Sequence, residues 1–312
     1  MNKQSDILYA EAPATVANVG CGFDVLGFAL QLPSDQVGVR FNSEKTVRLM
    51  EIQGDGGRLP KTADKNVAGF VIKQFLKSIG ETRGVDVFLN KGIPLSSGLG
   101  GSAASSVAAV VAVNALFKEP MKKNDLLALA VQGEELASDA GHADNVTPSL
   151  MGGFTLIANA KNLDVKALPV PEDMICIVVH PELEIKTKDA RDVLPRKIHL
   201  ADAVQQWGNL AAFISALYSK DFENIENYLK DTIVEPARQS LITGFEDVKN
   251  AALQSGAFAC SISGAGPSVF ALTFSNKDAG TIAYSMCDAF DKHNLASTSY
   301  TSKINTNGAK II

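Results

Sequence analysis

Residues 91–106, KGIPLSSGLGGSAASS, combine four glycines, five serines and a proline directly before an alanine- and valine-rich segment that is typical of a buried helix. A helix start exposes unpaired backbone N–H groups and the positive end of the helix dipole. Glycines before it let a polyanion approach the main chain. The pattern favours phosphate binding, although a flexible loop before a closely packed helix of small residues would have the same composition.

Two common phosphate-loop motifs do not account for this stretch. The Walker form is excluded because the stretch contains no Gly-Lys-Ser/Thr. The dinucleotide form is matched only formally, by Gly98, Gly100 and Ala103, since the apolar run VDVFL ends well before Gly98 and no leading βαβ unit contains the motif. An NAD site is therefore disfavoured.

A carboxylate lies on the apolar face of the next predicted helix, residues 124–138. At 100° per residue, Glu134 falls near the middle of the side that carries Leu127 and Val131. A buried carboxylate must be paired, protonated or bound to a cation. A salt bridge would satisfy it, but Glu134 and Ser102 also supply the oxygen ligands that Mg²⁺ uses beside a phosphate.

Polar residues gather in the segment GHADNVTPSLMGGF, where we expect a loop between Gly141 and Pro148. It contains His142, Asp144 and Asn145. Asp and Asn commonly initiate turns, so a structural role is the plain alternative to a functional one. A zinc site is disfavoured because no further spaced His or Cys ligands accompany His142.

Two arginines occur in segments with turn-forming residues, Arg191 in KTKDARDVLP and Arg238 in VEPARQSLI. Single arginines are usually at the surface, but a pair can hold a small carboxylate with bidentate geometry. The segment SISGAGPS is either a glycine turn between two strands or a second loop that closely approaches a ligand.

The composition is that of an ordinary globular protein. The chain has 312 residues, a formal net charge of −5, no basic block, and four cysteines without a Cys-x-x-Cys pair. These features give no reason to expect nucleic acid as a partner, and they favour reduced, buried thiols. The N-terminus lacks the pattern of a signal peptide, and no apolar run is long enough to cross a membrane, so we expect a cytoplasmic location.

The order of predicted elements indicates an α+β protein. Strand-like runs precede the two helices described above. A strand pair near GGFTLIAN and MICIVV, helical segments from about 200 to 255 and a strand–turn–strand at residues 258–274 follow. The lack of regular β-α alternation argues against a doubly wound sheet. The polar interruption ANAKNLD predicts two domains, residues 1–160 and 161–312.

Three motifs together resemble the GHMP kinase superfamily. PLSSGLGGSAASS resembles its phosphate loop, P-x-x-x-G-L-G-S-S-A-A, and the N-terminal PATVANVGCGFDVLGFAL and C-terminal SGAGPS resemble its other two motifs, in family order. ANVGCGFDVLGFAL, HADNVTPSLMGGF, TKDARDVLP and EPARQSLI are most similar to the homoserine kinases of that superfamily. The resemblance implies an N-terminal domain like that of ribosomal proteins, with a left-handed βαβ crossover, and a ferredoxin-like C-terminal domain.

The resemblance also implies the residues of a site for ATP, Mg²⁺ and L-homoserine. Mg²⁺ would be held by Ser102 and Glu134. Residues implied for ATP are Asn66, Lys91, Pro94, Ser97, Gly98, Leu99, Gly100, Gly101 and Ser102. Residues implied for homoserine are Asn18 and Asp24 near its amino group, Arg191 and Arg238 at its carboxylate, His142, Asp144, Asn145 and Thr187 around its hydroxyl, and Gly264.

The implied reaction transfers the γ-phosphoryl group of ATP to the homoserine hydroxyl, in threonine biosynthesis, and a homodimer is expected. One departure from the family loop is Gly101, which stands where a serine is usual. It keeps the backbone N–H, so we expect nucleotide binding to be retained. The alternatives are another kinase of the superfamily, acting on mevalonate or a sugar, and a non-catalytic ligand sensor on the same fold.

Overall fold

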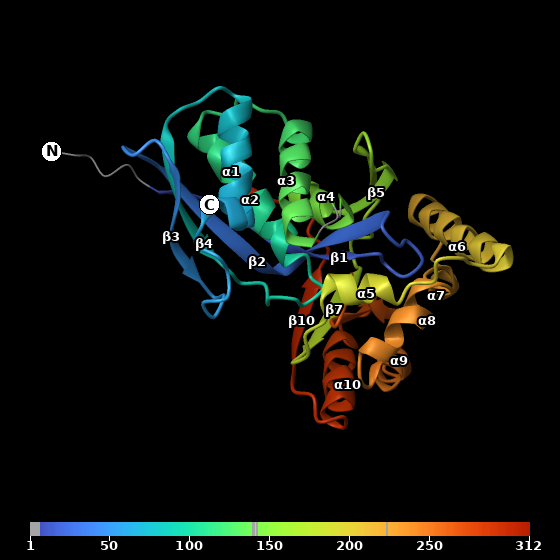
Figure 1. Ribbon diagram of the computed structural model, residues 1–312. Coiled ribbons are helices and arrows are strands. Elements are labelled where there is room, and N and C mark those ends of the chain that lie inside the picture. The colour runs from blue at the N-terminus through green and yellow to red at the C-terminus, as the bar shows by residue number, and fades with distance from the viewer. Residues whose placement is uncertain (1–6, 139–140, 142, 223) are drawn as a thin grey trace.

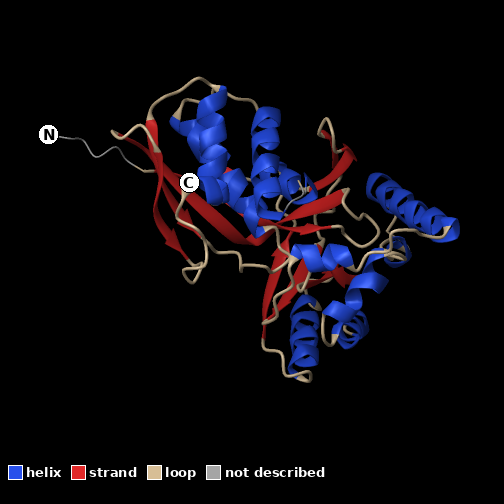
Figure 2. Ribbon diagram, in the orientation of Figure 1, coloured by secondary structure: helices blue, strands red, loops and turns tan. Residues whose placement is uncertain are grey.

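The computed structural model describes residues 7–138, 141, 143–222 and 224–312. Within these ranges the chain forms two β-sheets, each with helices packed against it (Figures 1 and 2). The mixture of mainly antiparallel sheets and helices confirms the predicted α+β class.

The first sheet is built around the long strand β2. Its order is β11-β1-β2-β4-β3, and β5 pairs with β2 and with β6. The strands are β1 (Leu8–Ala17), β2 (Leu26–Asn42), β3 (Val47–Gln53), β4 (Gly84–Asn90), β5 (Phe154–Asn159), β6 (Asp164–Leu168) and β11 (Lys310–Ile311). β3 and β4 are parallel neighbours joined through α1 (Val67–Ser78), which makes them a βαβ unit. The left hand of this crossover stays a prediction.

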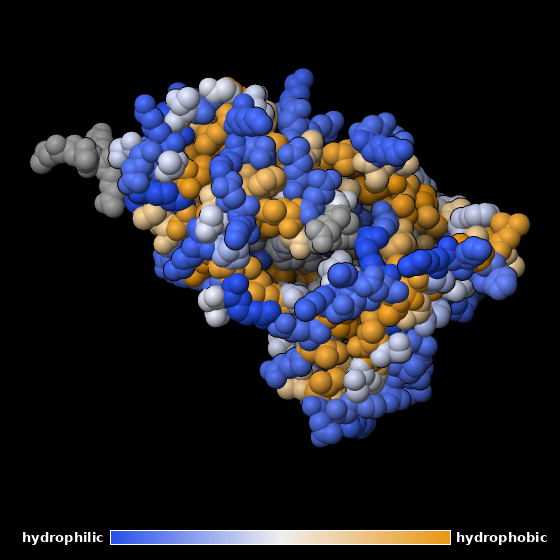
Figure 3. Space-filling model, in the orientation of Figure 1, coloured by the Kyte–Doolittle hydropathy of each residue, from blue (hydrophilic) through white to orange (hydrophobic). Residues whose placement is uncertain are grey.

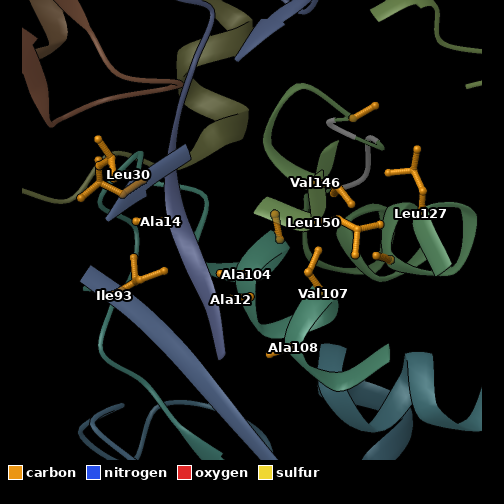
Figure 4. Close-up of a cluster of buried hydrophobic side chains, with 14 of the residues drawn as sticks. Ala12, Ala14, Leu30, Ile93, Ala104, Val107, Ala108, Leu127, Val146 and Leu150 are labelled. Atoms are coloured by element: carbon orange, nitrogen blue, oxygen red, sulfur yellow. The ribbon is translucent and has the colours of Figure 1, made fainter. Parts of the chain in front are cut away.

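α2 (Gly101–Leu116) is the central helix of the first layer. It packs against β1 and β2 on one side and against α1, α3 (Lys123–Ser138) and α4 (Ala143–Met151) on the others. A helix enclosed in this way must be apolar nearly all round, as its alanines and valines are. Figure 4 shows Ala12 of β1 beside Ala104 of α2, where small side chains allow a close approach.

The second sheet contains four antiparallel strands in the order β10-β7-β9-β8. They are β7 (Ile175–Pro181), β8 (Ala259–Ile262), β9 (Val269–Thr273) and β10 (Ser297–Lys303). The helices of this part are α5 (Thr187–Asp192), α6 (Leu200–Ser219), α7 (Ile225–Tyr228), α8 (Val234–Arg238), α9 (Phe245–Gln254) and α10 (Ala279–Asp291). Helical segments precede β8 and α10 precedes β10, which is the split βαβ order of ferredoxin-like domains.

One hydrophobic core extends from the first sheet to the second, and a second core lies between the second sheet and the helices α9 and α10. Phe28 and Phe154 of the first sheet contact Phe270 of β9 and Phe213 of α6, respectively. The last strand, β11, returns to the first sheet and pairs with β1. The boundary at residue 160 stays a prediction, and β6, which follows it, pairs with β5 of the first sheet.

Two details of the sequence interpretation are wrong. Asp144 and Asn145 do not lie in a loop but in α4. Burial of the side chains of Val146 and Leu150 stabilises the helix despite Pro148. The expected strand pair does not form either, because β5 and β7 belong to different sheets.

Three of the four free cysteines are buried as expected, and Cys287 is half-buried. Across the described part of the chain, no helix has the length and apolar character needed to cross a membrane.

Candidate active site

The glycine-rich stretch forms the connection between β4 and α2. Gly98 (φ +77°) and Gly100 (φ +66°) adopt left-handed backbone conformations, and Gly100 directly precedes the first residue of α2. Its carbonyl accepts the first helical bond, from Ala104 N at 2.8 Å. The preceding N–H groups of the first turn have no partner within the helix, so they are available at its N-terminus.

The SGAGPS segment packs directly on this loop. Ser263 Oγ donates to Gly98 O at 2.8 Å, and Ser268 N donates to Ser97 O at 3.2 Å. A Cβ on Gly98 would lie 2.5 Å from Ser263 O, so only glycine permits the approach. Two glycine-rich motifs that are far apart in the sequence therefore form one surface.

The N-terminal motif closes the same site from the other side. Asn18, itself left-handed at φ +69°, donates from Nδ2 to Gly264 O at 2.8 Å. Its Oδ1 accepts the N–H of Asp24 at 3.0 Å. Gly264 N in turn donates to Ala17 O at 3.2 Å. Asn18 thus links the N-terminal motif to SGAGPS and fixes the turn that presents Asp24.

A cavity of about 490 Å³ lies where the three motifs meet. In the space-filling view the surface is hollowed between α3 and α5 (Figure 3). Most of the predicted site residues line it: Asn18, Asp24, Asn66, Lys91, Pro94, Ser97, Gly98, Gly100, Gly101, Ser102, Glu134, Asp144, Asn145, Thr187, Arg191, Arg238 and Gly264. Leu99 is buried outside the lining, and His142 lies outside the described residues.

Both predicted arginines are in the cavity wall, beside the ring of Phe23. Their guanidinium carbons lie 5.8 Å (Arg191) and 5.2 Å (Arg238) from the ring centroid. Arg238 is 3% exposed and donates to the carbonyl oxygens of Ala190 and Gly264 at 2.9 Å each. Burial lowers the pKa of Arg238, against the opposing influence of Asp24. The two neighbouring guanidinium groups could together bind a small carboxylate.

Glu134 is only 5% exposed, as its position on the helix predicts. Its Oε2 accepts a hydrogen bond from Ser102 Oγ at 2.6 Å, which joins α3 to the first turn of α2. A hydroxyl and a carboxylate at a cavity wall are oxygen donors of the kind that Mg²⁺ accepts. No group of three or more His, Cys, Asp or Glu side chains that would hold a metal by themselves occurs among the described residues.

α4 contributes Asp144, which is 2% exposed, and Asn145. Asn145 Oδ1 accepts a hydrogen bond from Thr15 Oγ1 at 2.8 Å, while Thr15 N donates to Leu99 O at 3.1 Å. These two hydrogen bonds link α4 through β1 to the glycine-rich loop.

The side chains of two of the residues expected to bind the nucleotide, Asn66 and Lys91, already have structural partners. Asn66 caps α1 by accepting from Ala68 N at 3.1 Å, and it donates to Pro60 O at 3.1 Å. Lys91 forms a buried ion pair with Asp35 and donates to Gly101 O at 2.8 Å. Both still line the cavity, and their predicted nucleotide contacts stay predictions.

Sequence reasoning missed several residues that shape the site. They are Thr15, Phe23, Asp35, Arg58 and Ser105. Phe23 lies inside the N-terminal motif, directly before Asp24. Its position could have indicated that an aromatic ring lines the site. Asp35 gave no comparable sign, because a single Asp near a strand is usually solvent-exposed.

The chain matches known proteins along nearly its whole length. The family models "GHMP kinases N terminal domain" and "GHMP kinases C terminal" match residues 66–153 and 213–292. The homoserine kinase of Chlorobium phaeobacteroides strain BS1 is 44% identical over 96% of this chain and 98% of its own length. That of Chlorobaculum tepidum is also 44% identical, over 96% and 97%.

Solved structures agree with these relatives. The crystal structure of homoserine kinase from Cytophaga hutchinsonii is 48% identical, covers 100% of this chain and 99% of its own, and has a TM-score of 0.96. The mevalonate kinase of L. major, at 14% identity and a TM-score of 0.73, shares the fold. The fold is thus that of a GHMP kinase. Within that superfamily the chain belongs to the homoserine kinases.

Proposed function

We propose that this protein transfers the γ-phosphoryl group of ATP to the side-chain hydroxyl of L-homoserine, giving O-phospho-L-homoserine and ADP for threonine biosynthesis. The observation that carries the proposal is the convergence of three motifs on one cavity, with the N-terminus of α2 on one side and two arginines on the other. Phosphoryl transfer needs the donor and acceptor to be held in line and the developing charge to be spread.

The phosphate side is supplied by the loop before α2. Gly98 and Gly100 keep the main chain bare, and the N–H groups of the first turn point along the helix axis toward incoming negative charge. Ser97 Oγ is buried and has no hydrogen-bond partner among the described residues, so it is a further donor for a phosphate oxygen. These groups stabilise charge on the transferring phosphoryl without having to reorganise.

Ser102 and Glu134 are the residues that would hold Mg²⁺. Ser102 Oγ and Glu134 Oε2 lie 2.6 Å apart at the cavity wall, and hydroxyl and carboxylate oxygens are ligands that Mg²⁺ accepts. When bound, Mg²⁺ neutralises charge on the phosphate oxygens.

The acceptor side is formed by residues that match the two ends of an amino acid. Arg191 and Arg238 suit its carboxylate, and Asp24 suits its ammonium group. Arg191 Nε is a buried donor without a partner among the described residues, which supports a ligand carboxylate beside it.

Asp144, Asn145 and Thr187 line the cavity and would receive the hydroxyl, while the role expected for His142, which lies outside the described residues, stays a prediction. In this proposal Asp144, together with Asn145, orients the hydroxyl rather than removing its proton.

We also propose a homodimer and a cytoplasmic location for the enzyme.

The experiment that tests the function is Mg²⁺-dependent ADP release from ATP with L-homoserine, L-serine, L-threonine, mevalonate and galactose in parallel. We expect selective turnover of L-homoserine. Preference for mevalonate or galactose would support the proposed ATP site but contradict the residues proposed to bind homoserine. ATP binding without ADP release from any acceptor would favour a ligand sensor instead.

A further inference from the structure

A buried carboxylate lies beneath the phosphate loop and has no part in the chemistry above. Asp35, in β2, is completely buried and forms an ion pair with Lys91, whose side chain is 2% exposed. We propose that Asp35 is a positioning residue for the ATP phosphates, which fixes the two ends of the phosphate loop without touching the nucleotide. The inference rests on the proposed function.

Asp35 is bonded at both of its oxygens. Oδ1 accepts the backbone N–H groups of Gly92 and Ile93, each at 3.1 Å. Oδ2 accepts Ser105 Oγ at 2.7 Å and also the ammonium group of Lys91. A carboxylate offers about four acceptor positions, and these four donors occupy them. Asp35 is thus committed to the loop and is not free to bind substrate.

The four donors come from both ends of the loop. Gly92 and Ile93 lie two and three residues after the end of β4, where the loop begins, and Ser105 lies in the second turn of α2, after the loop ends. Lys91 completes the connection, because its Nζ donates to Ser105 Oγ at 3.0 Å and to the carbonyl of Gly101, the first residue of α2, at 2.8 Å. Asp35 therefore sets the spacing and direction of the first turn, whose N–H groups receive the phosphates.

General stability does not account for this arrangement well. A buried ion pair gains little net stability over well-packed apolar residues, because both charges lose their hydration. Fixing one geometry is a better-attested use of such a pair. A carboxylate is needed at this position, because the unpaired ammonium group of Lys91 at the start of α2 would oppose the helix dipole. Asp35 neutralises the charge of Lys91 and orients its ammonium group toward Gly101 O.

The test is the variant Asp35→Asn, in which the amide can still accept from the two backbone N–H groups but no longer carries the charge that holds Lys91 and Ser105. We expect ATP binding, measured by calorimetry with purified enzyme, to weaken by about tenfold, as loss of one charge-assisted hydrogen bond would cause. The KM for ATP should rise in parallel. The KM for L-homoserine at saturating ATP should stay within about twofold, because the acceptor residues do not contact Asp35.

Asp86→Asn is the matched control. Asp86 is also a buried carboxylate of the first sheet, 2% exposed, but it binds Arg40, Arg48 and Asn42 and does not line the cavity. Its loss should lower thermal stability and leave ATP affinity unchanged. If Asp86→Asn weakened ATP binding as much as Asp35→Asn did, the effect would be a general consequence of damaging the sheet, and the inference would be wrong.

A second pair of variants serves if Asp35→Asn does not fold. Ser105→Ala keeps the ion pair between Asp35 and Lys91 but removes the hydrogen bond from Ser105 Oγ to Asp35 Oδ2. We expect ATP affinity to fall by about threefold. Ser106→Ala, the neighbouring buried serine without a hydrogen-bond partner among the described residues, should change nothing. Normal ATP affinity in Ser105→Ala, or in folded Asp35→Asn, would overturn the inference alone. A wild-type enzyme that does not bind ATP would overturn the proposed function with it.

Discussion

Arg191 and Asp24 bind each other across the cavity. Arg191 Nη2 lies 3.0 Å from Asp24 Oδ1 and 3.1 Å from Asp24 Oδ2, and both side chains are more than a third exposed. The proposed substrate carries a carboxylate for the arginine and an ammonium group for the aspartate. When an amino acid binds, the ion pair between Arg191 and Asp24 would be replaced by two ion pairs, one between Arg191 and the ligand carboxylate and one between Asp24 and the ligand ammonium group. An exposed pair is worth little, so its replacement costs little.

The arginines give the first prediction. Arg191→Lys or Arg238→Lys should raise the KM for L-homoserine by about tenfold, because lysine keeps the charge but not the planar fork that binds a carboxylate at two points. Steady-state kinetics at saturating ATP measure this. Arg40→Lys, at a salt bridge outside the cavity lining, is the control and should leave the KM unchanged. Normal homoserine binding in both variants would mean that the carboxylate lies elsewhere.

The second prediction concerns Ser102. Ser102→Ala should lower kcat by about ten- to a hundredfold and shift the Mg²⁺ titration to higher concentration, because one of the two proposed protein ligands is removed. Ser106→Ala, one turn further along α2, is the control. An unchanged Mg²⁺ titration for Ser102→Ala would remove this residue from the metal site.

Asp144 gives a third prediction, which separates positioning from proton transfer. If Asp144 orients the acceptor, Asp144→Asn should raise the KM for L-homoserine by about tenfold with little change in kcat, since the amide can still bind a hydroxyl. Loss of kcat at saturating homoserine with an unchanged KM would show instead that Asp144 is the base.

Part of the first sheet, the helices α2 and α3 and the loop before α2 could be predicted from the sequence, because each depends on local signals, whereas β1, β6, β11 and α1 were not predicted. Alternation marks β3 and β4, and the glycine–serine run marks the start of α2. Glu134 was also predictable, since its burial follows from the periodicity of a single helix.

What failed depended on contacts between distant residues. α4 includes Pro148 and is nevertheless helical, because other elements bury its apolar face. The residues of the segment alone do not reveal that burial. The role of Asp35 depends on donors that are 56 to 70 positions away. The family resemblance proposed a set of site residues that local patterns could not supply, but that set did not include Asp35.

The fourth prediction follows from the pKa of His180. Burial lowers this pKa, and the nearby carboxylates of Glu182 and Glu184 oppose the shift only in part. The folded state therefore resists protonation more than the unfolded chain, whose histidine titrates near 6.5. Above that pH the histidine is neutral in both states, and as pH falls below it the unfolded chain takes up the proton and stability is lost.

Thermal unfolding at several pH values between 7.5 and 5 measures this. His180→Gln should flatten the acid side of the profile, and equal slopes in both proteins would contradict the prediction. His180 Nδ1 lies 3.2 Å from Ser268 Oγ, so the acid-sensitive contact belongs to the loop that packs on Ser97.

The last prediction compares two glycines that share a backbone conformation but not their surroundings. Gly100 (φ +66°) and Gly56 (φ +62°) are both left-handed, so alanine should cost about 1 kcal/mol of backbone strain at either position. Nothing lies within 4 Å of a Cβ on Gly56, whereas a Cβ on Gly100 would lie 2.2 Å from Thr15 Oγ1 and 2.7 Å from Asn145 Oδ1. Gly100→Ala must therefore also separate the bonded pair that ties α4 to the phosphate loop.

We expect Gly100→Ala to lose about 2 to 3 kcal/mol of unfolding free energy and most of its turnover, and Gly56→Ala to lose about 1 kcal/mol and no turnover. Denaturant unfolding and ADP release on the same samples measure both quantities. Equal loss of stability in the two variants would mean that the loop relaxes around the added methyl group. Full turnover in a destabilised Gly100→Ala would show that the contact between Thr15 and Asn145 does not hold the two halves of the site in register.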